Sequence, residues 1–251
     1  MKDVLSDRAR AILELLAHEG SLSVTRLSEQ LAVSVVTIRS DLKSLEELGY
    51  LERTHGGAAP AFHASILERL RDRSVEKGRI AKAAAAPVRD GDHIMVEAGT
   101  TAAMVVRQLA GKRDVHIVTN STLAMTWARA NPSLSVTITG GEYIRLTESL
   151  VGPLALEAIS RHNVRLAFVG TDGFSLERGM TARLAEGAAI VKAMVSRAET
   201  SVLLSDSSKY GRTGFVSVLP LSEMDHVIMD DGLSPDTASE IRGSGIDLCL
   251  V

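Results

Sequence analysis

Ser34-Val35-Val36-Thr37-Ile38-Arg39-Ser40-Asp41-Leu42 decides the fold of the N-terminal part, and Leu48-Gly49-Tyr50-Leu51-Glu52-Arg53-Thr54-His55-Gly56-Gly57-Ala58 follows shortly after. The first stretch opens with a serine that can cap a helix, and its apolar residues recur every three or four positions. The second stretch predicts a strand, a Gly-Gly turn and a return strand that Pro60 closes. We therefore expect a helix followed by a β-hairpin.

Two more helices are predicted ahead of this stretch. One begins after Ser6 and ends at Gly20, and a short one begins after Ser23. Three helices and a β-hairpin within residues 1–60 are typical of a winged helix-turn-helix. In such a domain the first turns of the last helix enter the major groove of DNA.

The outward face of the third helix and the hairpin carry the residues expected to meet DNA. Arginine can bind guanine edges, an exposed valine can touch a thymine methyl group, and hairpin residues can meet phosphates. The predicted DNA-binding residues are Ser34, Val36, Thr37, Arg39, Ser40, Lys43, Arg53 and His55. The pattern also allows a helical bundle with solvated charges, since residues 1–60 carry seven Lys and Arg against nine Asp and Glu.

Composition bounds the class of protein without indicating a nucleic-acid partner. The 251 residues carry a net charge of −3, which is not the balance of a basic DNA binder. Cys249 is the only cysteine, which excludes an intrachain disulfide, and its apolar surroundings predict a buried structural thiol. Charges among the first twenty residues predict no secretory signal, and no segment approaches the roughly 20 apolar residues of a membrane span. We expect a cytoplasmic protein with no membrane partner.

The rest of the chain predicts an α/β domain. Residues 61–74 are expected to form a linker or an exposed helix, and residues 75–251 alternate between apolar strands and helical segments. Such alternation predicts a mostly parallel sheet. The expected strands are 93–98, 115–119, 135–139, 165–169, 201–205, 227–229 and 247–251; the expected helices are 75–88, 101–110, 122–130, 153–160, 184–198 and 234–242.

Polar turns follow several of the predicted strands. Segments 97–101 and 119–121 each stand directly before a helix, and Gly140-Gly141 lies shortly before Arg145. Ligands of open α/β sheets bind at the carboxyl ends of the strands, and a helix N-terminus suits a phosphate. Segments 170–173 and 206–209 add two more polar turns to the same edge. The alternative is ordinary turn and N-cap chemistry.

The two stretches quoted first, with Ala32 and Val33 preceding them, closely resemble the DNA-binding signature of the DeoR family of regulators. The family usually has polar or acidic residues where this chain has Val35 and Val36, and an arginine where it has Ser40. The five polar turns resemble the DeoR-type sensor domain, which is similar in fold to ribose-5-phosphate isomerase, over roughly residues 75–250. The resemblance implies a transcriptional repressor of carbohydrate genes that responds to a phosphorylated sugar.

The resemblance also implies a set of residues around the sugar phosphate. Glu186 lies where the family carries an acidic residue that opens a helix, and Glu97, one methylene longer, replaces the family's usual aspartate. The implied pocket residues are Glu97, Gly99, Thr100, Thr101, Asn120, Ser121, Gly140, Arg145, Asp172, Glu186 and Lys209.

Two other classes of function compete with this interpretation. Asp172, Glu186 and Lys209 could serve an aldose–ketose proton shuttle in an isomerase with an accessory helical domain. The segment that is catalytic in the isomerase family is not intact, so we expect no enzyme. A protein–protein adaptor is the other alternative.

The seven histidines lack ligand spacing, so neither a metal nor another cofactor is expected. The expected partners are double-stranded operator DNA, a small phosphorylated sugar, and a second copy of the chain in a dimer or tetramer that spans two half-sites.

Overall fold

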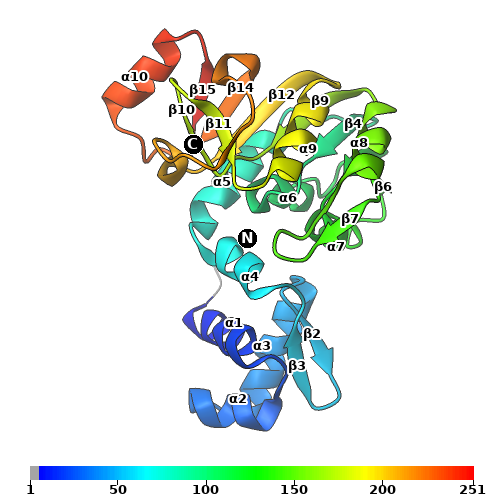
Figure 1. Cartoon of the computed structure of the whole chain (residues 1–251). Helices are drawn as coiled ribbons and strands as arrows, with labels where there is room; N and C mark the ends of the chain where they lie inside the picture. The colour runs from blue at the N-terminus through cyan, green and yellow to red at the C-terminus, as the bar shows by residue number, and fades with distance from the viewer. Residues whose placement is uncertain (1–5) are drawn as a thin grey trace. The chain divides into compact units, whose positions relative to one another are not determined.

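The structure is a computed structural model that describes residues 6–251. The chain divides into two compact units, one that runs to Ser74 and includes the short turn 145–148, and one that comprises residues 75–144 and 149–251. Figure 1 follows the chain through both units, which we describe one at a time.

The first unit is a winged helix-turn-helix, as predicted. Its sheet is antiparallel in the order β1-β3-β2, and Ile12, Leu27 and Ile38 lie in its core with no exposed surface. The elements are α1 (Asp7–Glu19), β1 (Leu22–Ser23), α2 (Val24–Leu31), α3 (Val35–Glu47), β2 (Leu51–Thr54), β3 (Gly57–Pro60) and α4 (Ala64–Arg71).

Serine side chains start the first three helices, which is why the sequence shows where they begin. Ser6, Ser23 and Ser34 each accept a hydrogen bond from the backbone N–H three residues further along the chain. Between α2 and α3 the chain turns through Ala32, whose φ of 53° lies in the left-handed region. The caps and this turn set the angle between the two helices of the motif.

Residues 61–74 differ from the predicted linker or exposed helix. They contain α4, whose Ile66, Leu67 and Leu70 are buried, and α4 packs against α1 in the same unit. Arg71 on α4 also forms an ion pair with Glu14 on α1. The apolar positions repeat at helical spacing and find a partner surface on α1, so the segment belongs to the core of the first unit.

The second unit is built on a parallel sheet of seven strands in the order β15-β14-β12-β9-β4-β5-β6. All seven strands and six helices predicted from the sequence are present, with ends that move by a few residues. The strands are β4 (His93–Val96), β5 (Val115–Thr119), β6 (Leu134–Ile138), β9 (Val164–Val169), β12 (Ala198–Ser205), β14 (His226–Met229) and β15 (Asp247–Leu250); the helices are α5 (Ser74–Ala85), α6 (Thr100–Arg107), α7 (Thr122–Ala128), α8 (Pro153–Ser160), α9 (Ala185–Val195) and α10 (Pro235–Gly243).

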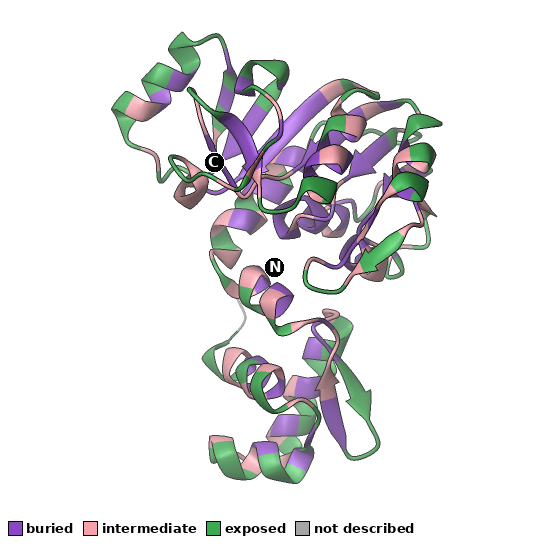
Figure 2. Cartoon of the chain, viewed as in Figure 1, coloured by how far each residue is buried: buried purple, intermediate pink, exposed green. Residues whose placement is uncertain are grey.

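The strand order reverses between β4 and β9. From β4 the chain proceeds to β5 and β6 on one side, and from β9 it proceeds to β12, β14 and β15 on the other. Buried residues of α8, α9 and α10 share one core cluster with one face of the sheet. Helices α6 and α7 connect β4 to β5 and β5 to β6, so the chain moves along the sheet in the opposite direction there. Right-handed crossovers therefore place these two helices on the opposite face. Figure 2 shows the sheet strands as largely buried between these layers.

Several short elements have no counterpart among the predictions. A hairpin of β7 (Glu142–Ile144) and β8 (Ser149–Val151) lies between β6 and α8. A small antiparallel sheet joins β10 (Gly173–Ser175), β11 (Gly179–Ala182) and β13 (Val216–Ser217). Two 3-10 turns, η1 (Ser207–Lys209) and η2 (Leu221–Glu223), complete the unit. Strands of two to four residues are too short to show a hydrophobic period.

Cys249 is exposed, which corrects the prediction of a buried thiol. It lies on β15, the last strand at one end of the sheet, where Leu248 points into the core. Alternate side chains of a strand point to opposite faces, so the residue next to an inward leucine points outward. Within residues 6–251, no helix is long and apolar enough to cross a bilayer.

Candidate functional site

The first candidate site is the outward face of α3. Val36, Arg39, Ser40 and Lys43 are exposed there, while the opposite face of the helix is buried. Val36 is apolar, yet 75% of its surface is accessible to solvent. A large exposed aliphatic side chain next to an arginine can contact a thymine methyl group while the guanidinium reaches a guanine.

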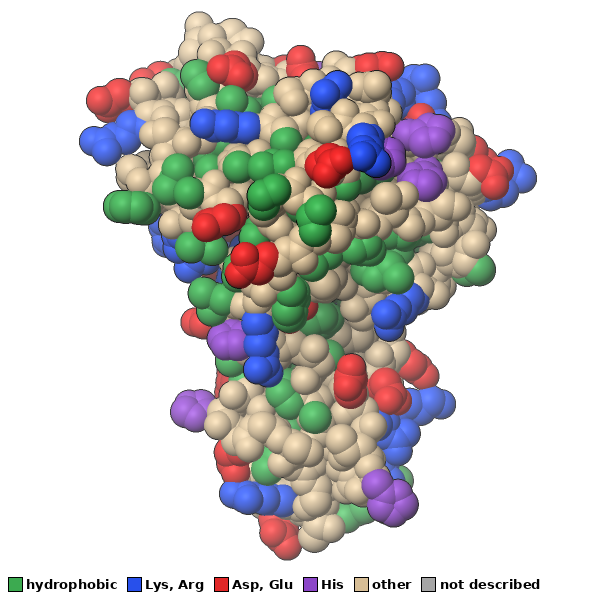
Figure 3. Space-filling view, turned by 45° about the vertical axis from the view of Figure 1, so that its right-hand side comes forward, with side chains coloured by type: hydrophobic (Ala, Val, Ile, Leu, Met, Phe, Trp, Pro, Cys, Tyr) green, Lys and Arg blue, Asp and Glu red, His purple; other side chains and the backbone are tan. Residues whose placement is uncertain are grey.

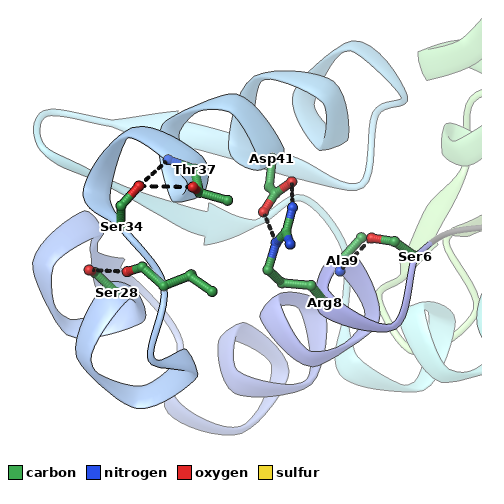
Figure 4. A network of polar contacts seen from close by, with 8 residues as sticks. Ser6, Arg8, Ala9, Ser28, Ser34, Thr37 and Asp41 are labelled. Atoms are coloured by element: carbon green, nitrogen blue, oxygen red, sulfur yellow. Dashed lines mark hydrogen bonds and ion pairs between the residues drawn. The ribbon is translucent and has the colours of Figure 1, made fainter.

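Two of the predicted DNA-binding residues have a structural role at the start of α3. The Ser34 hydroxyl accepts a hydrogen bond from the Thr37 backbone N–H at 3.1 Å, and the two hydroxyl oxygens lie 2.8 Å apart. Figure 4 shows this pair at the first turn of the helix. Ser34 and Thr37 therefore cap α3 and orient its first turn, whatever further contact they make with DNA.

The charged residues on and around α3 leave the Arg39 side chain free to contact a ligand. Among the described residues, the guanidinium groups of Arg39 and Arg53 have no hydrogen-bond or ion-pair partner, whereas Lys43 lies 3.9 Å from Glu47 on the same helix. Asp41, also on α3, is neutralised by Arg8 from α1 (Figure 4). His55 is exposed in the two-residue turn of the hairpin. Two uncommitted guanidinium groups and a neutralised carboxylate favour contact with an anionic partner.

Positive charge does not gather over a wide area. On the face shown in Figure 3, Lys and Arg side chains are interspersed with Asp and Glu. This distribution matches the net charge of −3. On this face, any binding of nucleic acid depends on a few local side chains rather than on a broad basic surface.

The second candidate site lies at the carboxyl edge of the parallel sheet. The polar turns that follow β4, β5, β6, β9 and β12 all leave the sheet at this edge, because the strands are parallel. The strand order reverses between β4 and β9, and ligands of open α/β sheets bind at such a switch point. Figure 1 shows the loops that leave these strands.

The turn after β4 opens the N-terminus of α6. Gly99 is the N-cap residue and no side chain caps the helix, so the backbone N–H groups of Thr100, Thr101 and Ala102 lack intrahelical partners. Both threonines are nevertheless buried, with 3% and 8% of their surface exposed. By contrast, the hydroxyl of Ser121 caps its own helix, α7, by accepting from the Ala124 N–H at 3.0 Å. Uncapped donors in a buried helix terminus suit an anionic ligand.

Asn120 brings an unsatisfied acceptor to the same edge. Its side-chain amide donates to the Leu150 carbonyl at 3.1 Å, and the Leu150 N–H donates to the Asn120 carbonyl at 2.8 Å. Among residues 6–251 the side-chain oxygen Oδ1 has no hydrogen-bond partner, although only 1% of the residue is exposed. Val96 of β4 is in register with Thr119 of β5, so Asn120 lies beside Glu97 at the next position. A buried acceptor without a donor calls for a ligand group that carries one.

Glu97 and the glycines around it close the turn. The Glu97 Oε2 atom accepts from the Gly99 N–H at 2.8 Å and from the Gly170 N–H at 3.3 Å. Gly170 directly follows β9 and was not among the predicted site residues. Its signal in the sequence was a glycine immediately after an apolar strand.

The remaining predicted pocket residues lie on separate elements. Arg145 is exposed in the turn between β7 and β8, Glu186 is exposed in the first turn of α9, and Lys209 is half-buried in η1. Asp172 accepts a hydrogen bond from the Arg183 N–H at 2.9 Å and forms an ion pair with the Arg183 side chain at 3.2 Å. Asp172 is thus already engaged by a cation from its own unit.

At the turn after β6, the second of two adjacent glycines is the one that the fold requires. Gly140 was the predicted site residue, and a Cβ there would meet nothing within 4 Å. A Cβ on Gly141 would lie 2.3 Å from the Val151 carbonyl oxygen, at a φ of 113°. The hairpin that holds Leu150 against Asn120 therefore depends on Gly141.

Two groups near this edge have altered acidities. Burial raises the pKa of the Tyr210 phenol, which follows Lys209 and meets Phe174 edge-on at 5.5 Å between ring centres. After β14, the Arg79 guanidinium of α5 lies 2.8 Å from the Asp231 carboxylate and lowers the pKa of that carboxyl. This ion pair joins α5 to the loop after β14.

Comparison with known proteins bears on both sites. Residues 8–61 match the DeoR-like helix-turn-helix domain, and residues 72–231 match the DeoR C terminal sensor domain. The chain belongs to the DeoR family. The HTH-type transcriptional regulator GlpR of Haloferax volcanii is 35% identical over 96% of each chain. A putative aga operon transcriptional repressor of Escherichia coli O157:H7 is 29% identical, over 98% of this chain and 94% of the relative.

Membership of the DeoR family confirms the resemblance noted in the sequence. The chain is a DNA-binding transcriptional regulator, and its relatives are regulators rather than sugar-phosphate isomerases. Among solved structures, the chain is similar to ribose 5-phosphate isomerase A of Methanocaldococcus jannaschii, with a TM-score of 0.38 and 22% identity over 53% of each chain. The individual DNA-contacting and pocket residues stay predictions.

Proposed function

We propose that this DeoR regulator represses transcription by binding operator DNA through α3 and the β2–β3 hairpin, and that a phosphorylated sugar at the carboxyl edge of the sheet changes its operator affinity. A relative named as a repressor of an aga operon supports the choice of repression. An operator-binding protein acts where the chromosome lies, so its place is the cytoplasm.

The observation that carries the effector proposal is the pairing of donors and acceptors at the switch point. The uncapped N–H groups at the start of α6 are donors in the positive end of the helix dipole, which suits a dianionic phosphate. The unpartnered Asn120 Oδ1 is an acceptor and needs a hydroxyl. A sugar phosphate carries a dianionic phosphate and sugar hydroxyls at a distance from it, whereas a free sugar lacks the anion and inorganic phosphate lacks the sugar hydroxyls.

The DNA proposal rests on the uncommitted arginines of the first unit. Arg39 projects from the exposed face of α3, and Arg53 projects from the hairpin strand β2. Arg39 is placed to read a base edge and Arg53 to contact a phosphate. One winged helix covers few base pairs, so we propose that two copies bind half-sites about 34–36 Å apart, or a multiple of that spacing.

Gating requires that the effector prefer one of two conformations. A ligand changes operator affinity only by the difference in its own affinity for the DNA-bound and free forms, and the coupling is reciprocal. The effector should therefore bind more weakly to the operator complex than to the free regulator if it induces transcription.

The test is a thermal-shift screen of the full chain against sugar phosphates, their unphosphorylated sugars and inorganic phosphate. A ligand at a hundredfold over its Kd should add about 2.7 kcal/mol to the free energy of unfolding. Each hit is then added to the regulator bound to an operator that has been selected from random duplexes. A hit that stabilises the protein without changing operator affinity would refute effector control, and failure to select any duplex would favour an adaptor.

A further inference from the structure

Glu97 occupies the backbone donors at the point where the sheet divides. Its Oε2 atom accepts from the N–H of Gly99, which follows β4, and from the N–H of Gly170, which follows β9. These are the two neighbouring strands between which the chain order reverses. A negatively charged side chain of the protein therefore already sits where a ligand of an α/β sheet is expected to bind.

The two glycines allow the carboxylate to approach this closely. A Cβ on Gly99 would lie 2.9 Å from Glu97 Oε2, and a Cβ on Gly170 would lie 3.3 Å from the same atom. Neither glycine has a positive φ, so neither is required by its backbone conformation. What a side chain at Gly170 would displace is the flexible end of Glu97.

The donors bound by Glu97 adjoin the donors left open by α6. The Gly99 N–H belongs to the N-cap residue, and the next three N–H groups of the helix have no intrahelical partner. A carboxylate is acceptor-only, as is a phosphate dianion, so the two compete for such donors. Two like charges 4 Å apart in bulk water disfavour one another by about 1 kcal/mol, which is a factor of about five in affinity, and by more in a half-buried site.

We propose that Glu97 is a built-in competitor of the effector phosphate. In the ligand-free protein its carboxylate holds the Gly99 and Gly170 amides, and a bound phosphate takes these amides and displaces it. This inference rests on the proposed effector site and adds the step by which that site is opened. Only a ligand with enough charge to displace a carboxylate binds, so the site admits phosphorylated sugars and rejects free sugars and simple monoanions.

Displacement also changes the link between two loops of the second unit. While Glu97 is in place, one side chain ties the turn after β4 to the turn after β9. Once the phosphate holds the amides, this tie is replaced by a contact through the ligand. The ligand-free and ligand-bound forms then differ at the sheet's switch point, which supplies the two states that an effector needs.

The decisive variants remove the competition without removing the donors. Glu97→Gln keeps the length of the side chain and an oxygen that can accept from both amides, but it removes the charge. Gly170→Ala keeps the charge and crowds the carboxylate oxygen, which must shift by a few tenths of an ångström from its place against the two amides. Glu177→Gln, on the exposed turn between β10 and β11, makes the same change in net charge and is the matched control.

The measurement is titration of the full-length protein with inorganic phosphate by calorimetry, with sodium chloride matched throughout. Glu97→Gln should bind phosphate at least about fivefold more tightly than the wild type. Gly170→Ala should also bind it more tightly, and Glu177→Gln should not differ from the wild type. Thr100→Asp should abolish phosphate binding in both the wild-type and Glu97→Gln backgrounds.

Each other result overturns the competition. Equal phosphate affinity in wild type and both variants would leave the phosphate site standing and refute a role for Glu97 as competitor. Weaker binding in both variants would make Glu97 a support of the loop. Tighter binding in Glu97→Gln that persists with Thr100→Asp would place the phosphate elsewhere. Absence of phosphate binding in every variant would refute the proposed site itself, and the inference with it.

Discussion

The Arg8 guanidinium meets the Asp41 carboxylate in a two-point ion pair, with Nε 2.5 Å from Oδ2 and Nη2 3.0 Å from Oδ1. The contact joins α1 to α3 across 33 residues of sequence. It also raises the pKa of the arginine through the hydrogen bonds to Asp41. Its consequence for the proposed function is that an acidic residue on α3, the proposed DNA-reading helix, carries no uncompensated charge.

Removing this compensation should weaken DNA binding through charge alone. In Arg8→Ala the Asp41 carboxylate stays on α3 and repels phosphates, so operator affinity should fall several-fold. The slope of log affinity against log salt concentration should become shallower by roughly one. The double variant Arg8→Ala/Asp41→Asn should recover most of the loss. Fluorescence anisotropy at several salt concentrations measures the operator affinity and its salt dependence for each variant. If the double variant binds as weakly as Arg8→Ala, the loss comes from direct DNA contact by Arg8.

Arg39→Ala should remove a base contact. The side chain is exposed on α3 and has no partner among residues 6–251, so its loss should cost about 1–3 kcal/mol of specific binding and leave folding unchanged. Non-specific binding should change little. Arg113→Ala, which removes an exposed arginine from the second unit, is the control. If Arg39→Ala discriminates between operator and random duplex as well as the wild type does, Arg39 does not read a base.

Thr100→Asp should uncouple DNA binding from the effector. The threonine lies in the first turn of α6, where a carboxylate is compatible with the helix dipole but takes the place of the phosphate. Operator affinity without effector should equal that of the wild type, and its response to the sugar phosphate from the screen should disappear. Melting curves confirm that the variant folds. A retained response would show that the turn after β4 only caps a helix.

The stability of the second unit should fall as the pH drops through the ordinary histidine range. Burial lowers the pKa of His116, and the nearby His93 and His162 lower it further. The unfolded chain therefore binds more protons near pH 6 than the folded chain, so stability is full above about pH 6.5 and declines below it. Urea unfolding at pH 8 and pH 5.5 should show the decrease, and His116→Gln should reduce it. An identical decrease in His116→Gln would assign it to other groups.

Two glycine substitutions should change stability in opposite directions. In Gly57→Ala the new Cβ would lie 2.1 Å from the Leu22 carbonyl oxygen, so the β1–β3 pairing should be lost at a cost of about 1–3 kcal/mol. In Gly187→Ala, inside α9, a Cβ meets nothing within 4 Å, and the variant should gain about 0.4–1 kcal/mol. Denaturant unfolding of both variants measures this. A neutral Gly57→Ala would mean that the wing tolerates separation from β1.

Local patterns accounted for most elements of the fold. The serine caps and the apolar spacing of α1 to α3 are properties of a few consecutive residues, and so is the alternation of apolar strands with helices after Val75. Where a pattern depended on partners, the predictions were wrong. Leu67 and Leu70, set among charged residues, predicted a linker or an exposed helix because their partner surface on α1 lies about fifty residues earlier.

At the candidate effector site, too, local features follow from the sequence and contacts between distant segments do not. A sequence can place Gly99 and Thr100 at the start of a helix and Asn120 after a strand, because turns and caps are local. It does not show that β4 lies beside β9, since strand order comes from the packing of helices on the two faces of the sheet. Only the folded chain therefore brings the Glu97 carboxylate to the Gly170 amide, 73 residues away. The residue types at the site follow from the sequence, and their partners follow from the tertiary structure, because hydrogen bonds between loops depend on which strands are neighbours.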